Sequence, residues 1–303
     1  MANDTKDHFL TEFRNRFGRL HRLGKSRSLF EVGDGAVRIY IRYSKVHPKG
    51  KTFFGLRKED LLQLEGHRSF ICFLWNNQQE PLFVPYSDYE DVFRAISPAG
   101  DGQYKAQVYL QEEGSEFYIA RVGRFSAESY FGWNYITSQM ETAKITEIPA
   151  LSHSQVQTLI GSIGLSKGFD VWIPRNDRGK LDWSLTQPFG IAAELPHQFH
   201  SIDSILSEVD ILWIERGAGK LRRLFEVEHS TPIYSGLLRF NDVHLTVANV
   251  QASYNIVSND ERRGLFVSQL GRPTFRASGL KTHCSFMNYQ DVYTWHRRIN
   301  DLK

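Results

Sequence analysis

The spacing of apolar residues changes in the middle of the chain, near the segment TAKITEIPALSHS at residues 142–154. Before it, short β-rich runs alternate with turn-forming residues, which predicts a mainly antiparallel barrel or sandwich over roughly residues 30–130. After it, helical and strand-like segments alternate, which is typical of an α/β domain. The chain has 303 residues and is long enough to bury two cores. We therefore expect two domains, residues 1–140 and residues 150–303.

The composition indicates a water-soluble globular protein. Hydrophobic residues make up 41% and charged residues 23% of the chain, and the net charge is +3. The two cysteines, Cys72 and Cys284, lack CxxC spacing, so neither a disulfide framework nor a zinc site is expected. The chain has neither the long apolar run of a membrane span nor the pattern of a signal peptide. We expect a cytoplasmic protein that does not bind a membrane.

Basic side chains are concentrated near the N-terminus. Residues 1 to about 30 predict a basic amphipathic helix. The run AVRIYIRYSKV alternates and predicts a half-buried strand whose outer face carries Arg38, Tyr40 and Arg42. The first domain is thus predicted to be a β-rich barrel or pseudobarrel that recognises DNA, although a generic basic surface has a similar composition. The candidate DNA contacts are Arg38, Arg42, Lys45, Lys49, Lys51, Arg57 and Lys58.

Two glutamates interrupt an otherwise apolar run in RRLFEVEHSTP, residues 222–232. Side chains alternate along a strand, so Glu226 and Glu228 share one face. If the RGAGK turn joins this strand to VDILWIE, Asp210 approaches the pair. Three converging carboxylates are costly unless a cation offsets their charge, and oxygen ligands favour Mg²⁺ or Mn²⁺. The alternative is the solvated face of an edge strand.

The order of elements after residue 150 resembles that of the PD-(D/E)xK nucleases. It reads helix, strand, Asp-bearing strand, E-x-E strand, helix and strand. Asp210 matches the first motif acid, and Glu226, sixteen positions further on, matches the second. Glu228 stands where the motif has lysine, as in some type II restriction endonucleases with an E-x-E motif, and no proline precedes Asp210. The resemblance covers residues 150–303.

This resemblance implies a restriction-endonuclease-like α/β core, in which helices flank a central mixed sheet. The implied reaction is Mg²⁺-dependent hydrolysis of double-stranded DNA at a specific sequence, with Mn²⁺ as a possible substitute. Asp210, Glu226 and the Val227 carbonyl would hold the metal, and Glu228 would orient or deprotonate the attacking water. A homodimer is expected, because two strands must be cut. The alternatives are a non-catalytic DNA-binding regulator and a structure-specific repair or recombination nuclease.

Further acids and histidines lie near these residues in sequence. Asp170, near the start of the first core strand, is expected to support the fold or the site residues, with a further metal carboxylate as the alternative. Solvated helix charges explain the next acids, with a second-metal ligand as the alternative; they are Glu194, Asp203 and Glu208. His197 and His200 have helical spacing but no third ligand of matching type nearby, so zinc is not expected.

Overall fold

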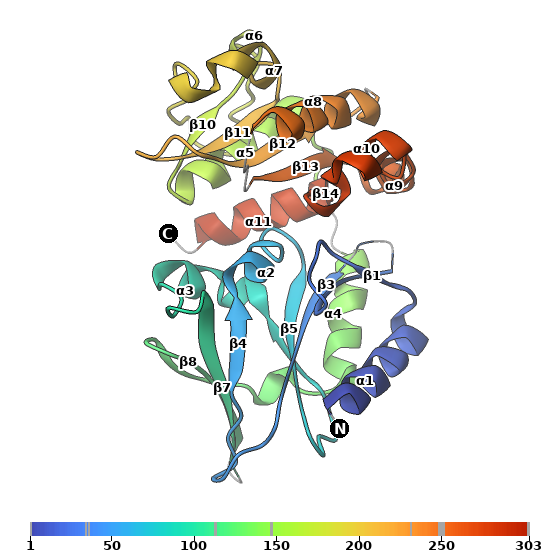
Figure 1. Cartoon of the computed structure of the whole chain (residues 1–303). Coiled ribbons are helices and arrows are strands. Elements are labelled where there is room, and N and C mark those ends of the chain that lie inside the picture. Colours follow the sequence, from blue (N-terminus) through green and yellow to red (C-terminus); the bar gives the residue numbers. More distant parts are fainter. Residues whose placement is uncertain are drawn as a thin grey trace. The chain divides into compact units, whose positions relative to one another are not determined.

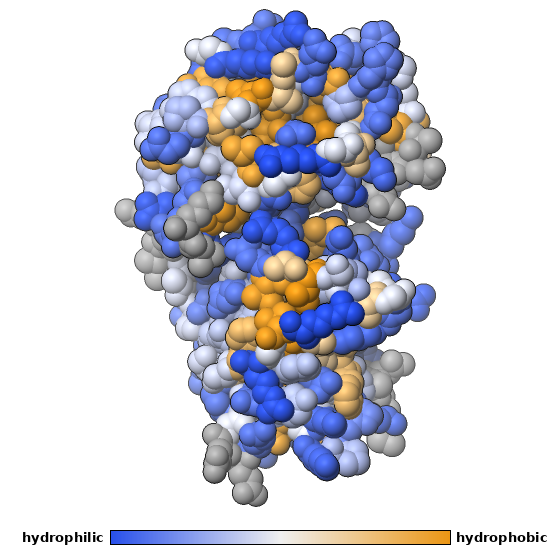
Figure 2. Space-filling view, turned by 90° about the vertical axis from the view of Figure 1, so that its left-hand side faces the viewer, coloured by the Kyte–Doolittle hydropathy of each residue, from blue (hydrophilic) through white to orange (hydrophobic). Residues whose placement is uncertain are grey.

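The chain divides into two compact units, which are described separately below. They comprise Met1–Glu147 and Ile148–Lys303. The structure is a computed structural model (Figure 1), and it describes residues 2–33, 35, 37–111, 114–145, 148–230, 232–247 and 252–301. None of the helices formed by these residues has the length and apolar character that a membrane span requires. Figure 2 shows one face of the molecule, which is mostly hydrophilic and has smaller hydrophobic areas over each unit.

The N-terminal unit contains two β-sheets and four α-helices among its described residues. The helices are α1 (Ala2–Phe17), α2 (Lys58–Leu62), α3 (Glu90–Ala95) and α4 (Trp133–Ile145). The five-stranded sheet has the order β1-β2-β3-β5-β6; its strands are β1 (Leu20–Arg22), β2 (Leu29–Val32), β3 (Val37–Ser44), β5 (Ser69–Trp75) and β6 (Leu82–Pro85). The four-stranded sheet has the order β4-β7-β8-β9; its strands are β4 (Phe54–Arg57), β7 (Gln103–Gln111), β8 (Gly114–Ile119) and β9 (Gly123–Ser126). Pairing among the described strands defines two separate sheets and does not show a closed barrel. The expected barrel therefore stays a prediction.

The N-terminal helix is shorter than its sequence predicts. It ends at Phe17, and Gly18 follows with a φ of 85° while its amide donates to the Arg14 carbonyl at 2.9 Å. Such a left-handed glycine is a common helix terminator. The residues expected to continue the helix instead form the antiparallel pair β1 and β2.

Strand β3 was expected to be half-buried, and this prediction is wrong. The strand lies between β2 and β5, so apolar layers cover both of its faces. Tyr40 and Ile39 belong to the cores on opposite sides, and both are fully buried. Arg38 is only 2% exposed. Its basic pattern does not form an outer face, because β3 is a central strand.

The C-terminal unit is built around a mixed sheet of order β10-β11-β12-β13-β14. The pairs β10/β11 and β11/β12 are antiparallel, whereas β12/β13 and β13/β14 are parallel. The strands are β10 (Phe169–Trp172), β11 (Ile211–Glu215), β12 (Leu221–Val227), β13 (Ser253–Ser258) and β14 (Cys284–Asn288). The helices are α5 (His153–Ser166), α6 (Arg175–Arg178), α7 (Asp203–Leu206), α8 (Ile233–Thr246), α9 (Arg263–Leu270), α10 (Pro273–Ser278) and α11 (Tyr289–Asp301). A central mixed sheet with flanking helices is thereby confirmed.

Alternation along β11 divides the core of this unit into two layers. Trp213 packs in the layer that includes α5 and α11, and Leu212 packs in the layer that includes α8. Helix α5 begins after Ser152, whose hydroxyl accepts from the Gln155 amide while the Gln155 side chain accepts from the Ser152 amide. This capping box fixes the start of α5 beside the end of the sheet where β11 begins.

Candidate active site

A hairpin brings the three predicted carboxylates together. Strands β11 and β12 are antiparallel, and Ile211 pairs with Phe225, which places Asp210 beside Glu226. The turn contains Gly217 and Gly219 at φ values of 74° and 62°, a conformation that glycine adopts without strain. One carboxylate oxygen of Asp210, Oδ2, accepts a 2.7 Å hydrogen bond from the Val227 amide and so ties the two strand ends together.

Glu226 is the most deeply buried of the three acids. Its side chain is fully buried, and both carboxylate oxygens accept hydrogen bonds from Arg239, each at 2.7 Å. Burial raises the pKa of Glu226 to about 8; the charges of Asp210 and Glu228 add to the rise, and Arg239 opposes it. Arg239 therefore opposes the rise in the pKa of Glu226 that burial causes.

Glu228 lies just beyond the end of β12. Its amide donates to the Val257 carbonyl at 2.8 Å, and its own carbonyl accepts from the Ser258 hydroxyl at 2.6 Å and from the Arg262 guanidinium at 2.5 Å. These backbone contacts hold Glu228 in line with the strand. It therefore keeps the face that it shares with Glu226, and it is only 2% exposed.

Helix α8 approaches the two glutamates closely at Gly236. A Cβ atom there would lie 2.8 Å from Glu228 Oε1 and 3.1 Å from Glu226 Cβ. Glycine at this position therefore makes room for both acidic side chains under α8.

Replacing Gly236 by alanine tests this close approach. Gly236→Ala is expected to lower the free energy of unfolding by about 1–3 kcal/mol, the usual cost of overpacking. Gly264→Ala, in α9, is the matched control, because no atom lies within 4 Å of its added Cβ. The control is expected to gain up to about 1 kcal/mol from helix propensity. Equal stabilisation of both variants in urea unfolding would contradict the predicted clash.

Two histidines flank the carboxylates. His153 Nε2, on the first turn of α5, lies 3.5 Å from Asp210 Oδ2, and this interaction raises the pKa of His153. His229 Nδ1 lies 3.2 Å from the Tyr289 hydroxyl, and the two rings stack. His153 thus contacts a site carboxylate, while His229 packs against α11.

Asp210 and Arg239 also line a polar cleft of about 840 Å³. The segment between β10 and β11 supplies most of the other wall residues, which include Asp177, Glu194, His197, His200, Asp203 and Glu208. Asp170 is not part of this lining; it pairs with Arg216 at 3.2 Å on the exposed surface. The cleft therefore joins the carboxylate site to acids that the sequence placed on solvated helices.

The carboxylates fit Mg²⁺ in donor type, because hard cations bind carboxylate and carbonyl oxygens. Within the described ranges, no group of three His, Cys, Asp or Glu side chains is spaced to hold a metal ion. At this site, both carboxylate oxygens of Glu226 accept hydrogen bonds from Arg239. The guanidinium of Arg239 is thus the cation that contacts Glu226 among the described residues.

The candidate DNA contacts of the N-terminal unit fall into two groups. Arg38 is internal: its Nε donates to Glu31 at 3.3 Å, and its Nη1 donates to the Gln63 carbonyl at 2.6 Å. Arg42 and Lys51 are half-buried, each beside an aromatic ring. The exposed candidates are Lys45, Lys49, Arg57 and Lys58. Arg38 is a structural residue, whereas the others reach the surface.

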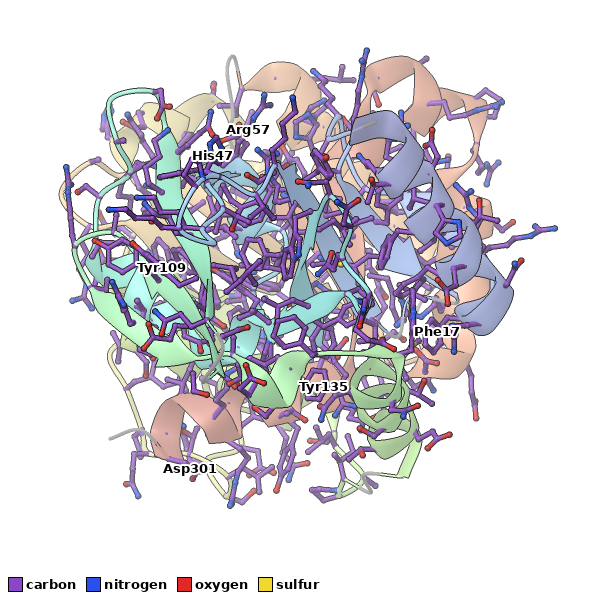
Figure 3. All side chains as sticks on the ribbon, turned by 90° about the horizontal axis from the view of Figure 1, so that it is seen from below. Phe17, His47, Arg57, Tyr109, Tyr135 and Asp301 are labelled. Carbon is purple, nitrogen blue, oxygen red and sulfur yellow. The ribbon has the colours of Figure 1, made fainter. Side chains whose placement is uncertain are left out.

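The outer face of the four-stranded sheet was not anticipated from the sequence. Strand register places Arg57 beside Gln103, Gln107 beside Tyr118, and Tyr118 beside Arg124. The Arg124 guanidinium lies 4.2 Å from the centre of the Tyr109 ring. The polar outer-face residues, which include Arg57 and Tyr109 labelled in Figure 3, are Arg57, Gln103, Lys105, Gln107, Tyr109, Glu116, Tyr118, Arg124 and Ser126. We call them the outer sheet face.

Comparison with known proteins gives one family model and one protein, each of which matches part of the chain. Residues 135–301, more than half of the chain, match the family model for the type II restriction enzyme NmeDI C-terminal domain. The type II restriction enzyme NmeDI of Neisseria meningitidis serogroup C is 30% identical over 132 residues, which are 41% of this chain and 37% of that protein. The chain therefore spans little more than a third of that relative. No solved structure matches the chain. The matched range contains Asp210, Glu226, Glu228 and Arg239.

Proposed function

The chain belongs to the family of the type II restriction enzyme NmeDI C-terminal domain, and from this relationship we propose that it is a Mg²⁺-dependent endonuclease for double-stranded DNA. The observation that carries the proposal is the meeting of Asp210, Glu226 and Glu228 at the end of one hairpin beside an open polar cleft. Relatedness to a restriction enzyme favours cleavage at a specific sequence. The C-terminal unit is the proposed nuclease domain, and the N-terminal unit is the proposed DNA-recognition domain.

Each acid has a proposed part in the reaction. Asp210, Glu226 and the Val227 carbonyl would hold Mg²⁺. When bound, the metal supplies Lewis-acid polarisation of the scissile phosphate and lowers the pKa of water. Asp210 lines the cleft through which DNA would reach the site. Glu228, held by its backbone contacts, orients the attacking water and accepts its proton. A homodimer would present two such sites to the two strands.

Digestion of phage DNA tests the proposal directly. With Mg²⁺ the protein is expected to produce discrete fragments, and chelation of the metal is expected to stop the reaction. A smear, or a preference for junctions and flaps, would support a structure-reading nuclease instead. DNA binding without any nicking would support a non-catalytic regulator. Mn²⁺ in place of Mg²⁺ provides a second readout of metal dependence.

We also propose that the outer sheet face and the exposed lysines of the preceding loop contact the duplex. Guanidinium and amide groups read base edges, and lysines neutralise phosphates. The outer sheet face presents such groups side by side, as Arg57 next to Gln103 and Tyr118 next to Arg124. Tyr109 holds the Arg124 guanidinium by a cation–π contact, and Glu116 accepts a hydrogen bond from it at 2.9 Å.

A charge-removal pair tests this surface. Arg57→Ala with Arg124→Ala is expected to weaken DNA binding, and the salt slope of log K should fall by about 0.9 for each arginine that neutralises a phosphate in the wild type. Arg94→Ala is the matched control, because Arg94 is an exposed arginine on α3, paired with Asp91, outside the outer sheet face. Fluorescence anisotropy over a salt series measures both quantities. An unchanged slope in the double variant would remove this surface from the proposal.

A further inference from the structure

Arg239 is placed unusually for a solvent-accessible arginine. It makes two 2.7 Å hydrogen bonds to a carboxylate that is fully buried, while about a third of its own side chain is exposed (32%). Among the described residues, Arg239 is the cation that contacts Glu226. The buried acid thus depends on a partner that reaches it from the cleft side.

Two further acids act on Arg239. Asp210 and Glu228 also act on the guanidinium electrostatically, in addition to the bonded Glu226. Burying a carboxylate without a cation is unfavourable, because the charge loses its hydration. Arg239 therefore supplies positive charge directly to Glu226, the most deeply buried of the three acids, while His153 contacts Asp210.

The same contacts exclude a second cation from Glu226. Arg239 occupies both oxygens of the carboxylate, so a metal ion can bind Glu226 only if at least one of these hydrogen bonds is broken. Arg239 lines the polar cleft of about 840 Å³. A released guanidinium therefore has open, polar space beside the site in which to move.

We propose that Arg239 is the resident countercation of this site and that a divalent metal ion binds by displacing it from Glu226. This inference rests on the proposed metal-dependent function. Arg239 stabilises the three carboxylates before the metal arrives and lowers the metal affinity by competing for Glu226. Arg239 is a positioning residue in this scheme, since it acts through Glu226.

Metal titration of the DNA-free protein tests the competition without relying on cleavage. Calorimetric titration with Mg²⁺ and Mn²⁺ is expected to show tighter binding to Arg239→Met, on the order of tenfold, the factor for about 1.4 kcal/mol. Arg239→Lys keeps the charge but loses the bidentate contact, so its metal affinity should lie between wild type and Arg239→Met. Without metal, the melting temperature should be highest for the wild type, lower for Arg239→Lys and lowest for Arg239→Met. Added Mg²⁺ should reduce the differences in melting temperature among the three proteins.

Arg222→Met provides a matched control. Arg222 lies on β12, is 33% exposed, and pairs with Glu215 through Nε at 3.1 Å and Nη2 at 2.6 Å. The control removes an arginine–carboxylate pair of similar exposure on the same strand as Glu226, and its metal affinity should stay at the wild-type value.

Equal metal affinities for wild type, Arg239→Lys and Arg239→Met would overturn the inference, and so would weaker binding by both variants. The Lys variant keeps the test decisive if Arg239→Met does not fold. Equal affinities together with metal-dependent cutting by the wild type would overturn this inference alone. A wild-type protein that neither binds metal nor cuts DNA would overturn the proposed function as well.

Discussion

An Asp210→Asn variant is expected to cut DNA about 10³-fold more slowly than the wild type while binding DNA with similar affinity. Metal-ion stabilisation of the reacting phosphate is worth several kcal/mol, and each 1.4 kcal/mol or so is tenfold in rate. Asn removes the negative charge but retains an oxygen that can accept from the Val227 amide, the contact that Asp210 makes at 2.7 Å. Single-turnover cleavage and anisotropy on the same DNA measure the two effects separately.

Asp170→Asn is the control for this variant. Asp170 is an exposed acid on β10 and pairs with Arg216 outside the cleft. Its replacement is expected to leave cleavage unchanged. Undiminished cutting by Asp210→Asn would remove Asp210 from the mechanism, provided that both variants melt at similar temperatures.

The carboxylate hairpin could be predicted because it follows from local rules. The twofold period of a strand places Glu226 and Glu228 on one face, and a short glycine-containing turn sends the chain back antiparallel. The resulting register puts Asp210 beside Glu226, as the pairing of Ile211 with Phe225 shows. Each step needs only residues close in sequence. The membership in a restriction-enzyme family, also expected from this order of elements, is confirmed.

Non-local contacts account for what the sequence did not reveal. Arg239 reaches Glu226 because α8 packs over the sheet at Gly236, and no motif in the sequence marks that approach. Arg38 is buried because β3 pairs in parallel with β5, whose first residue, Ser69, lies 31 positions later. The pairing of β14 with β13 is likewise decided by tertiary structure. Local alternation can predict which residues share a face, but neighbouring elements decide whether that face is exposed.

The same dependence on packing makes Trp213 the residue of the C-terminal core whose loss should cost most. It lies on β11, three positions after Asp210, and is fully buried. Its ring centre is 4.8 Å from that of Phe225 and 5.6 Å from that of Trp295. Its Nε1 donates to the Ile160 carbonyl at 3.2 Å, which ties the strand to helix α5.

Trp213→Ala is expected to lower the free energy of unfolding by roughly 3–5 kcal/mol, because a large cavity would open and the Ile160 carbonyl would lose its donor. Urea unfolding followed by circular dichroism measures the loss. Leu245→Ala is the control: Leu245 is 64% exposed on α8, and its truncation should change stability by no more than about 0.5 kcal/mol. A loss below about 1 kcal/mol for Trp213→Ala would show that the core collapses around the gap. Since β11 also carries the start of the carboxylate hairpin, cleavage by Trp213→Ala should fail at a lower temperature than cleavage by the wild type.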